Sequence, residues 1–439
     1  MINPRQIALD LINRVDQTDS YINLLLPKVL ERIEITDADR GLVQELSYGA
    51  LRWRRQYDAF IDQFTKGKVL SQQLRFAIQL GMHQLFRMRV PSHAAIHETV
   101  ELVKGFEKSA AGLANAVLRN ADRAGFDKLL ADSNAGLPEL EALAVKFSHP
   151  TWVIQALRTA LELDSKGDQL EELLIANNQT PTVNLAALPN TDAAKYLESI
   201  ELLRDPASPI GFLVHGNPEP HLSTPGVRVQ DAGSQLVALA LLEVGDKSGS
   251  WLDMCSGPGG KSALLQAGIA PYGGKLECFE PSKHRARLVR EALDPSKTGK
   301  VTIAYGQDAK PNSYDAILLD APCSGLGSVR RKPESRWRKQ PQMLGDLTNL
   351  QKDLLESAVQ ALKPGGVLLY STCSPLVTET NTQIRIALDT HKELSLLNTN
   401  EILNKLSPEL KMGTTRKTAQ LWTHLHGTDA MFMAVLRKA

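Results

Sequence analysis

Two cysteines lie in short polar segments of the C-terminal half of the chain. Cys323 ends Asp320-Ala-Pro-Cys323 and Cys373 ends Ser371-Thr-Cys373, and each segment follows an apolar run typical of a buried strand. A glycine-rich turn at residues 257–261 lies upstream. Carbon 5 of cytosine becomes a good nucleophile only after a thiolate adds to carbon 6, and another group must then help to complete the reaction. The combination therefore predicts methylation of cytosine in RNA.

The glycine-rich turn links a predicted strand to a predicted helix and is a candidate ligand site. It lies within Asp253-Met-Cys-Ser-Gly-Pro-Gly-Gly-Lys261, where glycines let the backbone approach a ligand closely. Glu280 follows the next predicted strand, where an acidic side chain typically accepts hydrogen bonds from ribose hydroxyls, and Asp308 follows the strand after that. We therefore expect a nucleoside ligand at the carboxyl ends of these strands.

Three nucleoside ligands fit this turn to different degrees. A phosphate-binding loop needs glycine where Cys255 stands, and the glycines at 257, 259 and 260 do not have the spacing of a dinucleotide-binding motif. S-adenosylmethionine has no pyrophosphate for the loop to bind. It is therefore the ligand that the turn, together with Glu280 and Asp308, favours.

The remaining cysteines and histidines indicate no metal site and no disulfide framework. Cys255 and Cys278 are most simply small buried hydrophobic residues, and the four cysteines contain no Cys-x-x-Cys pair. His93 and His97 have the spacing of two ligands on one helix face, but no third ligand lies nearby. With no signal peptide or apolar membrane span in the sequence, we expect a cytoplasmic protein that binds no metal and no membrane.

A thiol nucleophile needs positive charge nearby, because a free thiol is mostly protonated at neutral pH. The segment Arg330–Lys339 contains six basic residues and a tryptophan, which suits phosphate binding and base stacking, or else a solvated basic loop. The N-terminal run Arg52-Trp-Arg-Arg55 could likewise contact RNA phosphates and bases, or else form a solvated helix face with one buried tryptophan. Total charge is uninformative, because 50 basic residues nearly balance 49 acidic ones.

The chain has 439 residues, a length that predicts two or three domains. Its sequence pattern changes twice along this length, which gives three successive regions. Helical periodicity extends from Pro4 to about Asp132. Residues 147–229 mix a helical stretch (152–163) with short runs at 180–185 and 211–214, typical of a small α+β module. Strands and helices then alternate, which predicts a doubly wound parallel sheet with strands at 250–253, 275–279, 301–304, 315–319 and 367–370.

Together these segments resemble the RsmB (Fmu/Sun) group of RNA 5-methylcytosine methyltransferases over nearly the whole chain. Ala94–Glu98 and Asn115–Arg119 are similar to the NusB-like half of that family, and Val229–Gln235 is similar to its motif before the catalytic domain. The resemblance implies an α/β protein with three parts. These are an all-α NusB-like RNA-binding bundle (1–140), a small α+β RNA-binding module (141–232) and a Rossmann-like class I methyltransferase domain (233–439).

The resemblance also implies roles for the chemical residues. Cys373 would add to cytosine carbon 6, Cys323 would assist resolution of the adduct, and Asp320 would bind the cytosine edge near the donor methyl group. Glu280, in place of the usual Asp, would bind the ribose, and Asp308 would lie near the adenine amine. The S-adenosylmethionine site would comprise Cys255, Ser256, Gly257, Pro258, Gly259, Gly260, Lys261, Glu280, Asp308 and Asp320.

The implied activity is methylation of a specific cytosine in 16S ribosomal RNA, free or partly assembled, by a monomeric enzyme. Two alternatives stay open at this point. One is a transfer RNA substrate for the same chemistry. The other is a non-catalytic RNA-binding factor for ribosome assembly or antitermination, against which both cysteines, Asp320 and the donor loop argue. The segment Gly427–Phe432 lacks the family's usual Gly-Phe-Phe, so the last strands are the least defined by sequence.

Overall fold

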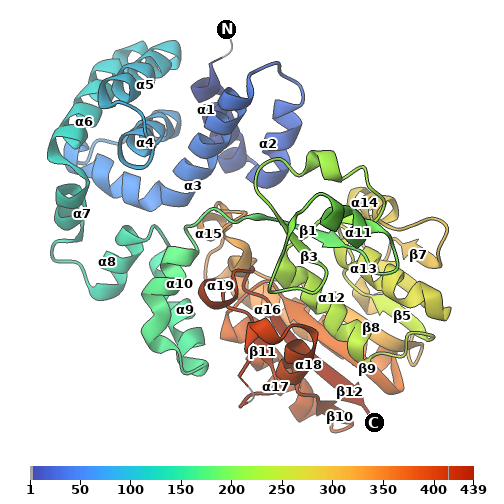
Figure 1. The fold of residues 1–439 in the computed structure, drawn as a ribbon. Coiled ribbons are helices and arrows are strands. Elements are labelled where there is room, and N and C mark those ends of the chain that lie inside the picture. Colours follow the sequence, from blue (N-terminus) through green and yellow to red (C-terminus); the bar gives the residue numbers. More distant parts are fainter. Residues whose placement is uncertain (1–2, 414) are drawn as a thin grey trace. The chain divides into compact units, whose positions relative to one another are not determined.

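The computed structural model describes residues 3–413 and 415–439, which form two compact units (Figure 1). Unit 1 comprises the chain up to Glu162 together with Val329–Lys339, and unit 2 comprises Leu163–Ser328 and Gln340–Ala439. The chain therefore leaves unit 2 after Ser328 and returns to it at Gln340. No helix within the described ranges is both long and apolar enough to cross a membrane.

Unit 1 is helical, as the sequence predicted. Its amphipathic helices bury one apolar face each; Leu9, Ile12 and Val15 of the first helix lie in a core shared with α3 and α4. Thr36 and Ser71 start α3 and α4 as N-caps, each accepting a backbone N–H of the first turn. The helices are α1 (Pro4–Gln17), α2 (Ile22–Leu30), α3 (Asp37–Thr65), α4 (Gln72–Arg87), α5 (Ser92–Phe106), α6 (Ala111–Ala124), α7 (Phe126–Asn134), α8 (Glu139–Lys146) and α9 (Thr151–Leu163).

The basic segment 329–339 belongs to unit 1 and includes the short helix α15 (Ser335–Arg338). Its side chains form hydrogen bonds to other residues of that unit. Arg338 donates to the carbonyls of Val15, Thr18 and Ser20. Trp337 Nε1 donates to Leu51 O at 2.6 Å. The fully buried Arg336 donates to Ser148 O at 3.1 Å. These three side chains thus form structural bonds to backbone carbonyls, so the segment is not a solvated loop. Phosphate binding by its other basic residues stays a prediction.

The basic run of α3 is likewise used inside unit 1. Arg52 is buried and donates to Arg330 O at 3.1 Å, and Arg54 pairs with Asp16 at 2.9 Å. Arg55 donates to His149 O at 3.2 Å. The guanidinium of Arg87 lies 3.3 Å from the centroid of the Trp53 ring. The run is therefore neither a solvated face nor an open basic patch.

The first of the two sheets of unit 2 is small and antiparallel, with the strand order β2-β3-β1-β4. Its core contains Leu185, Phe212 and Val227, packed against Leu197 of α11. The predicted short run at 211–214 is β3, and the run at 180–185 overlaps β1, which starts three residues later because Pro181 precedes it. The elements are α10 (Leu170–Ala176), β1 (Val183–Ala187), α11 (Ala193–Ser199), β2 (Leu203–Arg204), β3 (Gly211–Val214) and β4 (Val227–Val229).

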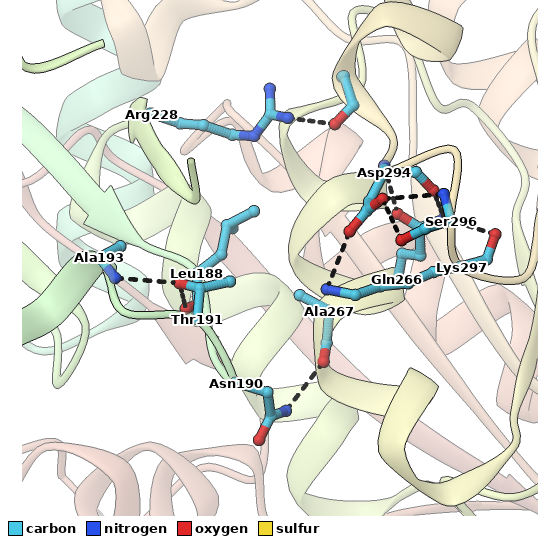
Figure 2. Close-up of polar contacts among 11 residues, drawn as sticks. Leu188, Asn190, Thr191, Ala193, Arg228, Gln266, Ala267, Asp294, Ser296 and Lys297 are labelled. Carbon is cyan, nitrogen blue, oxygen red and sulfur yellow. Dashed lines mark hydrogen bonds and ion pairs between the residues drawn. The ribbon is translucent and has the colours of Figure 1, made fainter. Parts of the chain in front are cut away.

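Polar contacts join this small sheet to the helices of the larger domain. In Figure 2, Asn190 Nδ2 donates to Ala267 O at 2.9 Å, and the Arg228 guanidinium points to a carbonyl oxygen, that of Ala292. The Asp294 carboxylate accepts the backbone N–H of Ser296, and the Asp294 carbonyl oxygen accepts a hydrogen bond from Gln266 Nε2. A cavity of about 300 Å³ lies between the two parts and is lined by Arg228, Gln266 and Lys297 among others.

The large sheet of unit 2 has the order β10-β12-β9-β8-β5-β6-β7, with β11 paired to β12. Its strands are β5 (Ser250–Asp253), β6 (Lys275–Phe279), β7 (Gly299–Thr302), β8 (Tyr314–Asp320), β9 (Leu362–Thr372), β10 (Leu394–Leu396), β11 (Ala419–Gln420) and β12 (Phe432–Lys438). Its helices are α12 (Ala232–Val244), α13 (Gly260–Ile269), α14 (Lys283–Ala292), α16 (Met343–Ala361), α17 (Asn381–Thr390), α18 (Thr399–Leu406) and α19 (Thr423–His426).

Helices cover both faces of this sheet (Figure 1). Alternate residues of β8 point to opposite faces: Ala316 and Leu318 pack with α12 and α13, whereas Ile317 and Leu319 pack with α16. Burial on both faces explains the unbroken apolar run of this strand. The α/β class is confirmed, and the predicted strands at 250–253 and 275–279 match residue for residue. The predictions at 315–319 and 367–370 lie inside β8 and β9, whereas the one at 301–304 is displaced by two residues from β7.

The sheet differs from the prediction at its β10 end. Strands β5 to β9 are parallel, but β12 lies between β9 and β10 and runs antiparallel to both. The apolar pattern of Phe432–Leu436 shows that this strand is buried on both faces, but no such pattern carries information on strand direction. The purely parallel sheet was therefore wrong for this edge.

Candidate active site

The two cysteine segments meet at the carboxyl ends of two neighbouring parallel strands. Asp320 is the last residue of β8 and pairs in register with Ser371 of β9. Cys323 and Cys373 follow in the two adjoining loops, and their Sγ atoms lie 3.4 Å apart. Both side chains are partly exposed. Parallel pairing of β8 and β9 is thus what brings together two thiols that are 50 residues apart in the chain.

Asp320 holds a lysine and a serine beside these thiols. Lys261 Nζ lies 2.7 Å from Asp320 Oδ2, and Ser371 Oγ donates to Oδ1 at 2.9 Å. Burial alone would lower the pKa of Lys261, but the charge and hydrogen bond of Asp320, together with Cys373 and Asp253, outweigh it and raise that pKa. Lys261 therefore stays positively charged and interacts electrostatically with Cys373.

The cysteines differ in how firmly they hold their protons. The hydrogen bond with Cys373, followed by burial, raises the pKa of Cys323 well above its ordinary value. Burial also raises the pKa of Cys255 and of Cys278. Cys278 is fully buried in the core, as predicted, whereas Cys255 is only partly buried at the edge of one. All three are therefore thiols rather than thiolates at neutral pH.

The glycine turn packs closely against Glu280 at the end of β6. A Cβ atom on Gly257 would lie 2.2 Å from Glu280 Oε2, so only glycine leaves room for this carboxylate. Glu280 is 2% exposed, and Arg285 Nη2 contacts its Oε2 at 3.3 Å and donates to Gly257 O at 2.7 Å. Gly259, with a φ of +107°, ends the turn and caps α13. The turn and Glu280 therefore form one surface at the ends of β5 and β6.

Two further acidic residues lie at strand ends. Asp253, at the end of β5, is buried and accepts the Ser262 hydroxyl at 2.6 Å. Asp308 follows β7 and is exposed, and its Oδ2 accepts the backbone N–H of Tyr305 at 2.8 Å. Glu280 and Asp308 thus follow strands β6 and β7, and Asp320 ends β8, so all three carboxylates belong to the carboxyl-terminal ends of the parallel strands.

Sequence inspection missed one buried residue of this site, Glu379. Its carboxylate accepts from Ser324 and Ser374, the residues that directly follow the two cysteines. The only signal in the sequence was an acidic residue in the polar stretch Thr378-Glu-Thr-Asn381 after the cysteine loop. Among the described residues, no group of three or more His, Cys, Asp or Glu side chains has the arrangement of a metal site.

The chain is similar to known RNA-modifying proteins over most of its length. A family model described as the 16S rRNA methyltransferase RsmB/F matches residues 239–437, and the NusB family model matches residues 2–123. A putative methyltransferase of Mycobacterium tuberculosis is 35% identical over 452 residues, which cover 99% of this chain and 96% of that protein. The ribosomal RNA small subunit methyltransferase B of Escherichia coli is 31% identical over 422 residues, covering 90% and 92%.

A solved structure extends the similarity to the fold of the whole chain. The crystal structure of PH0851 has a TM-score of 0.79 and 21% sequence identity to this chain, and the alignment covers 100% of this chain and 99% of that one. At this identity the likeness concerns the fold alone.

Proposed function

Because the chain belongs to the RsmB/F family of 16S ribosomal RNA methyltransferases, with a NusB-family N-terminal region, we propose that it methylates carbon 5 of a cytosine in small-subunit ribosomal RNA through a covalent cysteine adduct. One observation carries the proposal. The Sγ atoms of Cys323 and Cys373 lie 3.4 Å apart, next to Asp320 and its bonded lysine. Two thiols at a nucleoside-type site match a reaction that forms and then breaks a bond to the base.

Cys373 is the proposed nucleophile. Its sulfur adds to cytosine carbon 6, and the electron pair displaced from the ring double bond makes carbon 5 nucleophilic. The positive charge of Lys261, which interacts with Cys373, favours the thiolate form. The Sγ atom of Cys323, 3.4 Å away, lies close enough to assist at the same carbon–sulfur bond.

The residues of the glycine turn fit S-adenosylmethionine as the cofactor. The proposed site consists of the loop from Cys255 to Lys261 with Glu280 at the ribose, Asp308 near the adenine amine and Asp320 near the reacting centre. Because Gly257 has no side chain, the Glu280 carboxylate lies directly against the backbone of the turn, and these backbone groups and this carboxylate would bind the nucleoside. When bound, S-adenosylmethionine supplies the electrophilic methyl group.

The other residues complete the reaction in this proposal. Asp320, whose side chain is 29% exposed, binds the cytosine edge with the lone pairs that Lys261 and Ser371 leave open. After carbon 5 has been methylated, a base removes its proton, the electron pair restores the ring double bond and the carbon 6–sulfur bond breaks. Cys323 assists this release. The target base must be unpaired or flipped out to reach both thiol and cofactor.

Substitution of each cysteine tests the mechanism. We expect Cys373→Ala to abolish methylation, because no sulfur can add to carbon 6. Cys323→Ala is expected to form the adduct but release it slowly, so that an enzyme–RNA complex survives denaturing electrophoresis. Cys278→Ala, a buried cysteine outside the site, is the matched control and should turn over normally. Normal turnover by Cys323→Ala together with trapping by Cys373→Ala would reverse the two roles.

Bisulfite sequencing of RNA from cells with and without the gene tests the substrate. Loss of one 5-methylcytosine in 16S ribosomal RNA would support the proposal. Loss of a transfer RNA mark would keep the chemistry and change the substrate, and an unchanged pattern would favour the non-catalytic RNA-binding factor.

A further inference from the structure

A buried carboxylate ties the two cysteine loops to each other. Glu379 is fully buried at the end of the short 3-10 turn Val377–Glu379. Its Oε1 accepts the backbone N–H of Ser324 at 2.7 Å. Its Oε2 accepts the hydroxyls of Ser324 at 2.6 Å and Ser374 at 2.5 Å. Because Ser324 follows Cys323 and Ser374 follows Cys373, each loop is held by the residue next to its thiol.

Other contacts fix the carboxylate in place. Gln351 on α16 donates from Nε2 to Pro322 O at 2.8 Å and to Glu379 Oε1 at 3.2 Å. The Tyr370 hydroxyl donates to Glu379 O at 2.8 Å, which anchors the backbone of the same residue to β9. The hydroxyls of Ser324 and Ser374 also lie 3.1 Å from each other. Glu379 therefore joins both loops, α16 and β9.

The hydrogen bonds of Glu379 restrict the positions of both cysteine loops. A buried carboxylate is costly unless donors surround it, and hydrogen bonds to a charged acceptor are short and strong. A movement of either cysteine loop would break one or more of these bonds. The separation of the two thiols is thus coupled to the bonds of Glu379. Reaction rates depend steeply on such placement, since a misplacement of about 1 Å can cost on the order of 100-fold.

We infer that Glu379 is a positioning residue that holds Cys323 and Cys373 at the separation required for addition to the base and for release from it. This inference rests on the proposed function. Glu379 has no exposed surface, so it acts through the two loops and not by contact with RNA or cofactor.

Two substitutions separate this role from a requirement for the negative charge. In Glu379→Gln, the amide oxygen placed at Oε1 still accepts from Ser324 N and Gln351, while the amide nitrogen placed at Oε2 donates to the serine hydroxyls, which rotate to accept. Glu379→Ala removes every bond. We expect Glu379→Gln to keep kcat within about threefold of wild type, and Glu379→Ala to lower kcat roughly 100-fold with little change in the KM for RNA.

Matched variants keep the test interpretable. Gln383→Ala alters a neighbouring buried polar residue whose side chain donates to Thr378 O at 3.1 Å and not to either cysteine loop, so it should keep near-normal kcat. S-adenosylmethionine binding, measured by calorimetry, reports whether Glu379→Ala is folded, because the glycine turn and Glu280 share no bond with Glu379. If that variant is unfolded, Ser324→Ala combined with Ser374→Ala removes both hydroxyl donors and should lower kcat about tenfold or more.

The outcomes distinguish this inference from the proposed function. Wild-type kcat in a folded Glu379→Ala chain, or in the double serine variant, would overturn the positioning role even if Cys373→Ala is inactive. An active Cys373→Ala chain would instead overturn the proposed function, whatever Glu379 does. Slow turnover by Glu379→Ala with rescue by Glu379→Gln would support the inference.

Discussion

At the scale of single residues, the cation beside the thiols is Lys261. The sequence offered Arg330–Lys339 as the source of positive charge, because those residues closely follow Cys323. Lys261 instead bonds Asp320, which is 59 residues away, and interacts with Cys373. A lysine that ends a glycine turn therefore serves the reacting centre in our proposal as well as the cofactor loop. Nearness in the sequence did not identify the charged neighbour of the thiols, because electrostatic interactions depend on distance in space.

Asp253 makes the stability of the protein depend on pH. Burial raises its pKa to about 7, whereas an aspartate in an unfolded chain titrates near 3.9. Between these values the unfolded chain has lost the proton that the folded chain keeps. The contribution of Asp253 to the free energy of unfolding is therefore greatest below a pH of about 4. It falls by up to about 1.4 kcal/mol per pH unit as the pH rises toward 7.

Asp253→Asn should remove this dependence, because an amide does not titrate and its oxygen still accepts the Ser262 hydroxyl. We expect the variant to gain stability relative to wild type as the pH rises from 4.5 to 6.5. Urea unfolding of both proteins at several pH values, with tryptophan fluorescence as the signal, measures the difference in stability. Unfolding midpoints that change in parallel over this range would contradict the prediction.

At the scale of elements, strand ends and helix starts position the site. β8 and β9 carry Asp320 and Ser371 side by side, and α13 starts at the glycine turn so that Lys261 lies in its first turn. Helix α12 joins the small sheet to the large one: Asp231 caps it by accepting Gly233 N, and the fully buried Gln235 bonds the small sheet. Two residues of the Val229–Gln235 segment, Asp231 and Gln235, therefore have structural roles at the start of α12.

Substitution of Gln235 tests this junction. Gln235 accepts from Ser208 Oγ at 2.6 Å and donates to Asn184 Oδ1 at 2.9 Å and Gln230 O at 2.8 Å. Gln235→Leu keeps the volume but leaves these buried partners unsatisfied, which should cost about 2 kcal/mol in the free energy of unfolding. Chemical denaturation measures the loss. Ser234→Ala, at the adjacent partly exposed position, should cost less; equal costs would contradict the special role of Gln235.

At the scale of the whole molecule, the two compact units do not follow the order of the chain. Residues 329–339 lie between β8 and α16 in sequence but belong to unit 1. They supply it with donors from Arg336, Trp337 and Arg338, and Glu334 accepts the N–H of Ile22 at 2.8 Å. Unit 1 is therefore complete only with a segment from the second half of the chain. The division into parts at 140 and 232 stays a prediction.

A fragment of residues 1–162 should therefore bind the missing segment as a separate peptide. We expect a peptide of residues 327–341 to raise the Tm of the fragment by roughly 5 °C or more at 100-fold excess over Kd, since such an excess adds about 2.7 kcal/mol. Thermal unfolding with increasing peptide measures this. A peptide that carries Trp337→Ala and Arg338→Ala is the control, and equal effects of the two peptides would refute the prediction.

The sequence by itself determined the elements and the chemical groups of this protein. Strand positions such as 250–253, the glycine turn and the two cysteines after strands could be predicted because they depend on residue alternation and turn chemistry over a few neighbouring residues. These patterns, with the family resemblance, also indicated the fold class and the candidate site.

Only the tertiary structure decided which groups meet. The bond of Lys261 to Asp320, the bonds of Glu379 to both cysteine loops, the antiparallel course of β12 and the packing of Trp337 in unit 1 all join residues far apart in the chain. Such contacts depend on how strands order themselves in a sheet and on which buried polar groups find donors. No local pattern carries that information, because the partners become neighbours only when the chain has folded.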